Sequence, residues 1–358
     1  MQIYEYLFAG LIIVALLTGS TVMMISMSTP ISNASDKDLL KVTGEKIMTQ
    51  LLLDPGYPSS WGSDNVTQEI TVFGLAKYGQ TSRDAYDLDP NKVLQIGKID
   101  GLTNYPISKN IVLDLLNLEN TYGFTIEFKE ALRITSPQQT GPNSYSITVT
   151  SDYNLPLMGT QVSAVLYYID NSQSPPKIAH EGTIHGSTLY DGSCSLEFTS
   201  SPTTDKILFV AANYYGIHQA KLFQINSGTP LHATLFQDRL VPDPATPYQI
   251  QNGADSREVL LIRTESGFEA NDFQITNAGT ASNFVLENPP ENSAIAVIAI
   301  SGNNLLLADR DFSQIVYRTI DFPDPNTRAT DSAYSLDRTV QIDGSTFTAT
   351  LYIWRMSY

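Results

Sequence analysis

Four histidines are the residues of this 358-residue chain best suited to acid–base catalysis or to binding a transition metal. His180 and His185 are five residues apart, so they do not share one face of a strand. His218 follows two tyrosines and a glycine and is interpreted as a half-exposed sheet residue; the fourth histidine is His232. Because there is no Cys/His cluster and no H-E-x-x-H pattern, the sequence predicts no transition-metal site.

Other catalytic signatures are also missing from the sequence. It contains no G-x-S-x-G nucleophile elbow, no P-loop and no dinucleotide-binding fingerprint. Its 37 acidic residues include no pair that spacing singles out for hydrolysis. A Ser-His-Asp triad assembles only in three dimensions, so an anchored hydrolase stays open as a third hypothesis. We expect that the protein is not an enzyme, has no catalytic residue and takes no cofactor.

Two acidic turns carry the hard oxygen ligands that calcium prefers. They lie at Asp309–Asp311 and Asp321–Asn326. Neither turn follows the EF-hand pattern, and acidic turns are most often simply solvated. The sequence therefore predicts no metal site, and calcium binding at these two turns stays open as an alternative.

Aromatic side chains present a flat apolar face with a polar tip, which suits recognition of sugars or partner proteins. The candidates are Tyr57, Trp61, Tyr214 and Tyr215. For each of them, packing under a loop is the favoured interpretation, and recognition is the alternative. Trp354 alternates like a core residue and is left out. Cys194 is the single cysteine, so we expect a buried thiol, with an intermolecular bridge as the alternative.

The composition argues against some partners and favours strands. Lys and Arg number 21 against 37 Asp and Glu, which gives a formal net charge of −16. This balance opposes binding to phosphate backbones through charge, so nucleic acid is not expected as a partner. The 19 tyrosines favour strands over helices, and the length allows two or three domains.

The segment Leu7–Met27 is apolar and carries no charge over its 21 residues. A helix of this length spans the roughly 30 Å hydrocarbon core of a bilayer. We expect residues 1–30 to form a transmembrane or filament-core helix that contacts the membrane. A cleaved signal peptide is the alternative, but no basic residue precedes the apolar run. Sequons at Asn33 and Asn65 are candidate glycosylation sites and favour an extracytoplasmic location for the remainder of the chain.

Residues 31–137 have the pattern of a mixed α+β domain. Ser35 is a capping residue for a helix from Asp36 to about Leu53, which has one apolar face. That face consists of Leu39, Leu40, Val42, Ile47, Met48, Leu51 and Leu52. We expect it to cover the protein's own sheet, with a second protein as the alternative. An Asp-Pro pair at 89–90 predicts the start of another helix, and Phe124–Phe128 alternates as a strand.

Short strands separated by turn clusters follow, a pattern typical of β-sandwiches. We predict a β-sandwich domain over 138–226 and a C-terminal β-rich domain over 227–358. Asp343-Gly344 lies between two strands and is a strong signal for a hairpin turn. The predicted fold is therefore a membrane anchor helix plus an α+β domain, followed by mainly β domains of the immunoglobulin-like sandwich type.

Several motifs in the first third of the chain resemble those of archaeal pilin-like surface proteins. They are the apolar N-terminal helix with Glu5 near its start, Leu51–Pro58, Trp61-Gly62, Phe73–Ala76 and Leu88–Val93. The middle of the chain is similar to immunoglobulin-type modules of secreted archaeal proteins. The segments Arg338–Gly344 and Leu351–Arg355 also resemble parts of such proteins.

The resemblance implies a role for Glu5. In type IV pilins an acidic residue five positions into the mature helix helps to set subunit register, and Glu5 matches it if Met1 is the mature start. The sequence departs from the pilin pattern because it shows no basic leader ahead of a processing site. A carboxylate in the headgroup zone of a membrane is the alternative for Glu5.

The leading hypothesis is an extracytoplasmic structural protein, pilin-like or part of a surface filament or cell envelope. It acts in assembly or adhesion, with other copies or cell-surface proteins as partners, and makes its contacts through sheet edges and loops. The alternative is a membrane-tethered receptor that binds a ligand or a glycan. An apolar pocket lined by aromatic residues would favour the alternative.

Overall fold

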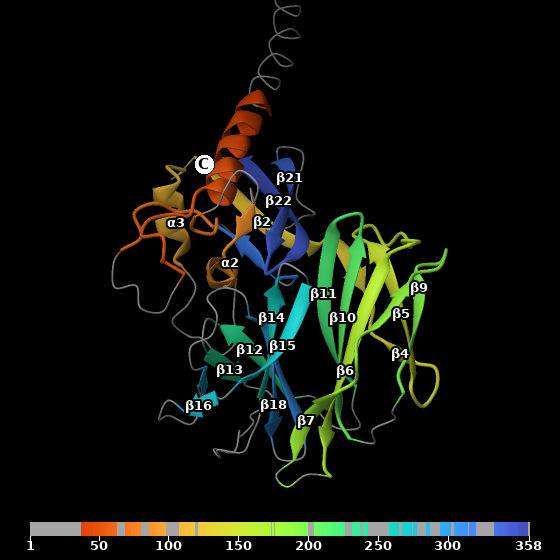
Figure 1. The fold of residues 1–358 in the computed structure, drawn as a ribbon. Helices are drawn as coiled ribbons and strands as arrows, with labels where there is room; N and C mark the ends of the chain where they lie inside the picture. Colours follow the sequence, from red (N-terminus) through yellow and green to blue (C-terminus); the bar gives the residue numbers. More distant parts are fainter. Residues whose placement is uncertain are drawn as a thin grey trace, which may run out of the picture.

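The computed structural model describes residues 37–62, 69–79, 86–97, 107–118, 121–199 apart from 173 and 175, 204–225, 231–236, 239–242, 258–264, 267–273, 275–277, 284–286, 294–301, 304–313, 315–319 and 333–356. The described part is mostly β-strand, as predicted. Its helices are one over residues 37–53 and the short α2 (Pro90–Ile96) and α3 (Lys109–Leu115). Figure 1 shows three bodies, which we call the first body, the sandwich and the third body.

The first body is built from both ends of the described chain. Its sheet has the strand order β1-β21-β22-β2-β20. The strands are β1 (Asp87–Leu88), β2 (Tyr122–Glu130), β20 (Val316–Arg318), β21 (Ala333–Ile342) and β22 (Ser345–Arg355). The long central pair is antiparallel and runs from Tyr122 opposite Arg355 to Glu130 opposite Phe347. The sandwich and the third body are therefore inserted between β2 and β20.

This topology corrects the domain boundaries that the sequence suggests. β21 and β22 complete the sheet of the first body, so they do not belong to a separate domain over 227–358. The physical reason is burial, because Leu351 and Ile353 of β22 lie in the core of the first body. At the other boundary, Leu132–Ile134 already pairs with the sandwich, so the first body does not extend to residue 137.

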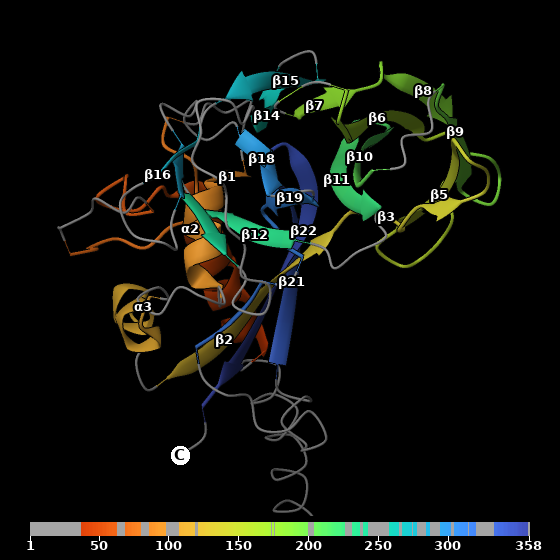
Figure 2. The same cartoon turned by 90° about the horizontal axis from the view of Figure 1, so that it is seen from below.

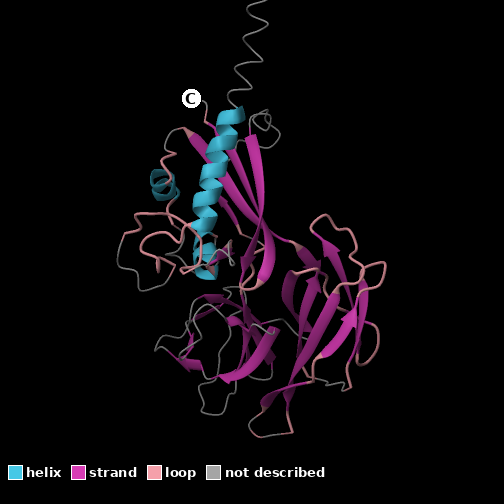
Figure 3. Cartoon of the chain, turned by 45° about the horizontal axis from the view of Figure 1, so that its top comes forward, coloured by secondary structure: helices cyan, strands magenta, loops and turns pink. Residues whose placement is uncertain are grey.

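The helix over residues 37–53 lies along the sheet of the first body (Figure 3). Its buried face consists of Leu40, Ile47, Met48, Leu51 and Leu52. Gly44 allows the close approach, because a Cβ at this position would lie 3.0 Å from Leu336 Cδ1 and 3.2 Å from Ile353 Cγ2. The expectation that this helix covers the protein's own sheet is confirmed.

The loops after this helix pack around Lys92 and Trp61, and they contain the motifs that carry the family resemblance. Lys92 is fully buried, and its Nζ donates hydrogen bonds to the carbonyl oxygens of Pro55 (2.9 Å) and Ala76 (3.1 Å). The Trp61 Nε1 donates to the Gly74 carbonyl at 3.0 Å, and Lys92 Nζ lies 5.8 Å from the Trp61 ring centroid. Burial lowers the pKa of Lys92. These motifs therefore form one structural cluster beside α2.

The sandwich consists of two facing sheets that share one core. One sheet contains β3 (Leu132–Ile134), β4 (Gln138–Gln139), β5 (Ser144–Ser151) and β9 (Ser193–Glu197). The other contains β6 (Gln161–Asp170), β7 (Lys177–His180), β8 (Ile184–Ser187), β10 (Lys206–Tyr214) and β11 (Ile217–Ile225). Cys194 is buried in the shared core, as predicted, and burial raises the pKa of its thiol.

The third body is one sheet with the strand order β15-β14-β18-β19-β12-β13-β17-β16. Its strands are β12 (Leu231–Phe236), β13 (Arg239–Pro242), β14 (Glu258–Thr264), β15 (Gly267–Phe273), β16 (Ile275–Asn277), β17 (Phe284–Leu286), β18 (Ala294–Ser301) and β19 (Asn304–Asp309). β12 and β19 run parallel to each other. Within this sheet, β18 and β19 lie next to the sandwich, and β12 and β13 lie next to the first body (Figure 2).

Apolar cores cross the boundaries between the three bodies. Tyr167 and Phe209 on the outer face of the sandwich share a core with Leu307 of the third body. Phe236 and Val241 of the third body belong to the core of the first body. The three bodies are therefore packed against one another through buried apolar side chains.

Several predicted features fall outside the part of the chain that the structure describes. These are the anchor over residues 1–30 with Glu5, and the sequons at Asn33 and Asn65. Across the described ranges, no helix has both the length and the apolar character needed to cross a bilayer. The anchor, the register residue and the glycosylation sites stay predictions.

Candidate functional site

The helix over 37–53 carries an apolar stripe on its outer side. Leu39 is 51% exposed, Val42 is 67% exposed and Leu53 is 44% exposed. Leu39 and Val42 were expected on the buried face, and that part of the prediction is wrong. With 3.6 residues per turn, the seven expected positions cover more of the helix circumference than one sheet can bury. The stripe therefore offers the helix a second packing surface.

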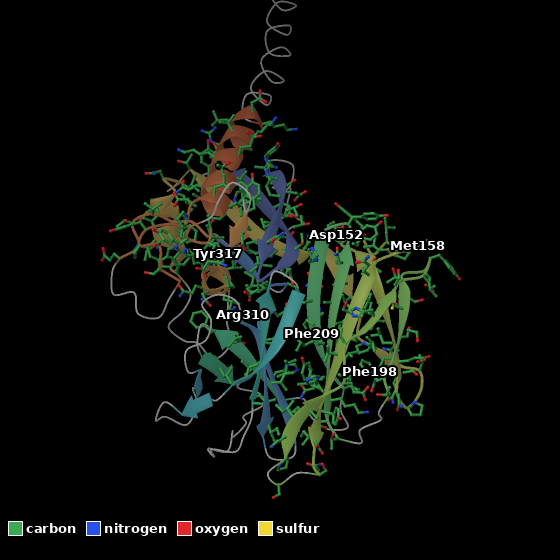
Figure 4. The ribbon with its side chains drawn as sticks, viewed as in Figure 1. Asp152, Met158, Phe198, Phe209, Arg310 and Tyr317 are labelled. Carbon is green, nitrogen blue, oxygen red and sulfur yellow. The ribbon has the colours of Figure 1, made fainter. Side chains whose placement is uncertain are left out.

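Four large apolar side chains are exposed on two loops of the sandwich, and we call them the tip surface. Leu155 (63% exposed) and Met158 (67%) lie between β5 and β6, and Leu189 (60%) and Tyr190 (81%) lie between β8 and β9. Figure 4 shows Met158 at the outer edge of the sandwich. Large apolar side chains exposed together on neighbouring loops are typical of interaction sites.

Hydrogen bonds hold the two tip loops to each other. Gly159 N donates to the Thr188 carbonyl at 3.0 Å, and Thr188 N donates to the Thr160 carbonyl at 3.0 Å. Thr160 N also donates to the Thr188 hydroxyl at 2.9 Å. Gly192 closes the second loop at a φ of 76° and donates from its N to the Leu189 carbonyl. A partner would therefore meet a preorganised surface, which lowers the entropic cost of binding.

A cavity of about 540 Å³ lies where the three bodies meet. It is lined by the end of β2, by the turn before β22 and the start of that strand, by β11, by β12 and by the end of β19. Hydrogen bonds join the bodies beside it: His218 N donates to the Thr346 hydroxyl (3.1 Å) and Ala220 N to the Ser345 hydroxyl (3.3 Å). The cavity wall therefore depends on all three bodies.

A buried ion pair closes one side of this cavity. Arg310 Nη1 lies 2.7 Å from Asp343 Oδ2, and the two side chains are 3% and 5% exposed. The Nε of Arg310 (labelled in Figure 4) donates to the Leu235 carbonyl of the third body at 3.1 Å, and its ion pair with Asp343 links that body to the first. Burial raises the pKa of Asp343, and Arg310 opposes that change. A second pair, Lys221 and Glu130 at 3.0 Å, joins the sandwich to the first body.

Two residues that line the cavity each carry a buried oxygen without a hydrogen-bond partner. Within the described residues, Gln219 Oε1 and Asp343 Oδ1 are buried and accept no hydrogen bond. An unsatisfied buried acceptor costs about 1–3 kcal/mol of stability. Burial raises the pKa of Asp309, which also lines the cavity, to about 6. Sequence reasoning missed the cavity because its residues come from distant segments.

The aromatic candidates separate into exposed and buried residues. Tyr57 is 62% exposed and Tyr215 is 92% exposed, whereas Tyr214 is half-buried with its ring centroid 4.8 Å from that of Tyr215. Trp61 is 2% exposed, which confirms the favoured interpretation that it packs under a loop; it fills the cluster around the buried lysine. Trp354 is buried as predicted. The sequence signal for the missed tip surface is an apolar pair directly before an Asp-Gly turn.

The histidines and acidic turns form no metal cluster in the part of the chain that the structure describes. No described group of three or more His, Cys, Asp or Glu side chains is placed to hold a metal ion. His185 Nδ1 lies 2.9 Å from the Ser163 hydroxyl on exposed surface, and the His180 ring centroid lies 5.9 Å from that of Tyr167. Asp311 Oδ1 accepts from Ser313 N at 2.9 Å. The turn Asp321–Asn326 lies outside the described residues.

Comparison with known proteins gives no relative that identifies the chain. No family model matches it, and no curated protein is significantly similar. Invasin, a bacterial integrin-binding protein, aligns at 15% identity over 62% of this chain and 53% of its own, with a TM-score of 0.16. Human GIVD cytosolic phospholipase A2, in complex with methyl gamma-linolenyl fluorophosphonate, aligns at 11% identity over 66% and 33%, with a TM-score of 0.10. The chain spans about half the length of invasin, and TM-scores this low carry no argument about fold or function.

Proposed function

We propose that the protein is an extracytoplasmic structural protein of the cell surface, pilin-like or part of a filament or cell envelope, that acts in assembly or adhesion. Residues 1–30 anchor it in a membrane or in the core of a filament. The sandwich acts as an immunoglobulin-like module that presents loops to other copies or to cell-surface proteins. The role includes no catalysis, no cofactor and no nucleic acid.

The tip surface is the observation that carries this proposal. Its four apolar side chains are each at least 60% exposed and stand on loops held by backbone hydrogen bonds. Monomeric soluble proteins rarely expose apolar patches without a use for them, and aromatic residues and methionine are enriched in protein interfaces. A rigid apolar surface at the edge of the sandwich is suited to holding a protein partner rather than to catalysis.

The outer stripe of the helix supports the assembly part of the proposal. Leu39 and Val42 continue the apolar character of the predicted anchor onto the described helix. In a filament this stripe packs against a neighbouring helix. In a plain membrane anchor the same stripe stays exposed above the bilayer.

The test compares two variants of the full chain in binding to cells and in self-association. Met158→Ser with Tyr190→Ser removes the centre of the tip surface, and Tyr78→Ser removes a tyrosine that is 73% exposed on the first body. We expect the tip variant to lose at least tenfold in binding, and the control to stay within twofold. Equal binding by the two variants would show that the tip surface is not the contact.

Electron microscopy of surface material tests the assembly part separately. Regular filaments built on packed N-terminal helices would support a pilin-type subunit and a register role for Glu5. Discrete particles that remain with detergent would make the helix a plain anchor, and the tip surface would then serve adhesion alone.

A membrane-tethered ligand-binding receptor is the second candidate function. The junction cavity favours it, because its volume of about 540 Å³ lies within the usual range for small-molecule sites. The cavity mixes charged side chains with apolar ones, including Phe312 and Phe347, so it is not the apolar pocket lined by aromatic residues that would favour a glycan receptor.

A further inference from the structure

A second cavity, of about 850 Å³, lies between the first body and the sandwich, and we call it the side groove. The first body lines it with one face of β21 and β22 and with the end of β2. The sandwich lines it with β3, with the loop after β5 and with Lys221 of β11. Figure 4 shows Asp152 of that loop on the side of the sandwich nearest the first body. The volume lies within the usual range for small-molecule sites, which often form between domains.

The floor of the side groove is the face of the first body's sheet that is turned away from the helix over 37–53. Leu336 of β21 packs beside that helix, so Asp337, the next residue, points to the opposite face. Across the strand pair, Asp337 lies opposite Thr350 of β22. Because β22 is hydrogen-bonded to a strand on each side, the floor offers side chains rather than backbone groups to a ligand.

Hydroxyl groups are the most frequent polar groups of this lining. Eight of the fifteen lining residues are Ser, Thr or Tyr. Thr350 is 6% exposed, but its hydroxyl makes no hydrogen bond with a described residue and remains accessible from the groove. The Tyr352 hydroxyl donates to Glu127 Oε1 at 3.1 Å and keeps lone pairs for an incoming donor. The floor can therefore donate hydrogen bonds to a ligand and accept hydrogen bonds from it.

The charged side chains of the side groove balance one another, in a chain whose formal net charge is −16. Three are basic and three are acidic: Lys129, Arg133, Lys221, Glu130, Asp152 and Asp337. Two of the bases already have an acidic partner, because Lys221 lies 3.0 Å from Glu130 and Lys129 lies 2.6 Å from Glu127. A ligand with a net charge of either sign gains little here, so the groove favours a neutral ligand.

An exposed aromatic ring also belongs to the lining. Tyr153 is 78% exposed, and its ring provides the flat apolar face that the hydroxyl-rich floor lacks. Hydrogen bonds hold its loop in place: Tyr153 N donates to Ser151 Oγ at 3.2 Å, and Arg133 Nη1 donates to Asn154 Oδ1 at 2.9 Å. The ring is therefore presented beside the floor by a preorganised loop.

Hydroxyls, neutrality and an aromatic face together define a ligand class. A sugar ring has hydroxyl groups around its edge and C–H groups on its faces, so it matches both the floor and the tyrosine. We propose that the side groove binds a neutral oligosaccharide, with its hydroxyls bonded to Thr350, Asp337 and Arg133 and one ring stacked on Tyr153. The proposal goes beyond the structural role proposed above and uses none of the four residues of the tip surface, so either proposal can fail alone.

Isothermal titration calorimetry on the full chain tests the ligand class with neutral and charged probes. The neutral probes are lactose, maltotriose and acetylated chitotriose, and the charged probes are sialyllactose and chitotriose without its acetyl groups. We expect saturable binding of a neutral probe, with a raised melting temperature, and at least tenfold weaker binding of its charged counterpart. Saturable binding of the charged probes alone overturns the assignment of the ligand class. Absence of saturable binding by all three neutral probes overturns the proposal as a whole.

Two substitutions with a matched control locate the site. Tyr153→Ala and Thr350→Val each remove one proposed contact, and Thr339→Val is the control because Thr339 is exposed on β21 and does not line the groove. We expect each groove variant to weaken binding of the neutral probe at least tenfold. The control and the tip variant, Met158→Ser with Tyr190→Ser, should stay within twofold of the wild type.

Groove variants that bind like the control would place the sugar elsewhere and overturn the proposal. Loss of sugar binding in the tip variant would also overturn it, because the tip surface would then be the contact. If Thr350→Val fails to fold, Tyr153→Ala still decides, since it changes an exposed side chain.

Discussion

Asp343 combines two roles at a single position. Its φ of 49° belongs to the hairpin turn that it forms with Gly344, and its carboxylate pairs with the buried guanidinium of Arg310. The turn demands a residue that tolerates the left-handed region, and the ion pair demands a negative charge. Aspartate meets both demands, whereas asparagine meets only the first.

Substitution of Asp343 separates these two roles. We expect Asp343→Asn to keep the turn but to lower the free energy of unfolding by about 3–5 kcal/mol, because it removes the charge opposite a buried cation. Asp343→Ala should cost more, since alanine also strains the positive φ. Urea denaturation measures both values. The double variant Arg310→Met with Asp343→Asn is the control, and it should recover part of the loss; no recovery would mean that the pair is not the cause.

The carboxyl of Asp309 makes stability depend on pH. Its pKa is about 6 in the folded chain against 3.8 as the ordinary value, and the first cause is burial. The folded state therefore holds this proton more tightly, so the contribution to stability is complete below about pH 4 and is lost as the pH rises through 6. The charged groups around it are Glu130, Lys221, Arg310, Asp311, Asp343 and His232.

We expect Asp309→Asn to remove this dependence. Relative to the wild type, the variant should gain about 1–2 kcal/mol in unfolding free energy between pH 4.5 and pH 7.5, a value reduced for partial exposure of the residue. Urea denaturation at the two pH values measures the difference, and titration of the other groups cancels in the comparison. A pH-independent difference between the two proteins would contradict the prediction.

At the scale of elements, the helix over 37–53 has an inner and an outer face with different roles. Leu51 is 1% exposed, so Leu51→Ala should cost about 2–5 kcal/mol of stability. Val42 is 67% exposed, so Val42→Ala should cost less than about 0.5 kcal/mol of stability.

Val42→Cys should form cross-linked dimers in assembled material, while the buried Cys194 stays unreactive. Dimers that depend on Cys194 would instead place that residue at a contact.

Elements whose signals are local could be predicted from the sequence. Asp89 caps α2 by accepting from Asn91 N and Lys92 N, and proline follows it, as the motif indicates. The Asp343-Gly344 hairpin also forms as predicted. Which side of the helix over 37–53 is buried could not be predicted from residue type. Leu39 and Leu40 are equally apolar, and only the position of the sheet makes one exposed and the other buried. Fully buried Lys92 was not predicted, since its partners are backbone carbonyls that any residue provides.

The whole molecule should unfold as one unit. Phe209 of the sandwich and Leu307 of the third body share a core, and Phe236 of the third body joins the core of the first. Calorimetry of the full chain should therefore show one main transition rather than three. Phe209→Ala should lower that transition as a whole, whereas separate loss of one peak would show that the bodies unfold independently.

Topology at this scale could not be predicted because its determinants are distant in the chain. β2 alternates like any half-buried strand, and nothing in Tyr122–Glu130 specifies a partner at Ser345–Arg355. The predicted division at residue 227 rested on short strands separated by turn clusters, which are local signals. The junction cavity has the same origin, since Gln219, Asp309 and Asp343 meet only after all three bodies have packed.

The pairing of β2 with β22 also sets an order of events during synthesis. A ribosome releases β2 early, yet its central neighbour consists of the 11 residues of β22, near the end of the described chain. Until those residues emerge, the apolar face of the helix over 37–53 has no sheet to pack against. Both edges of β2 also lack their neighbouring strands. The inserted bodies emerge while the first body is still incomplete, so the part nearest the predicted anchor is the last to have all its strands. A chain cut short by even one strand would leave that part exposed to proteases and chaperones.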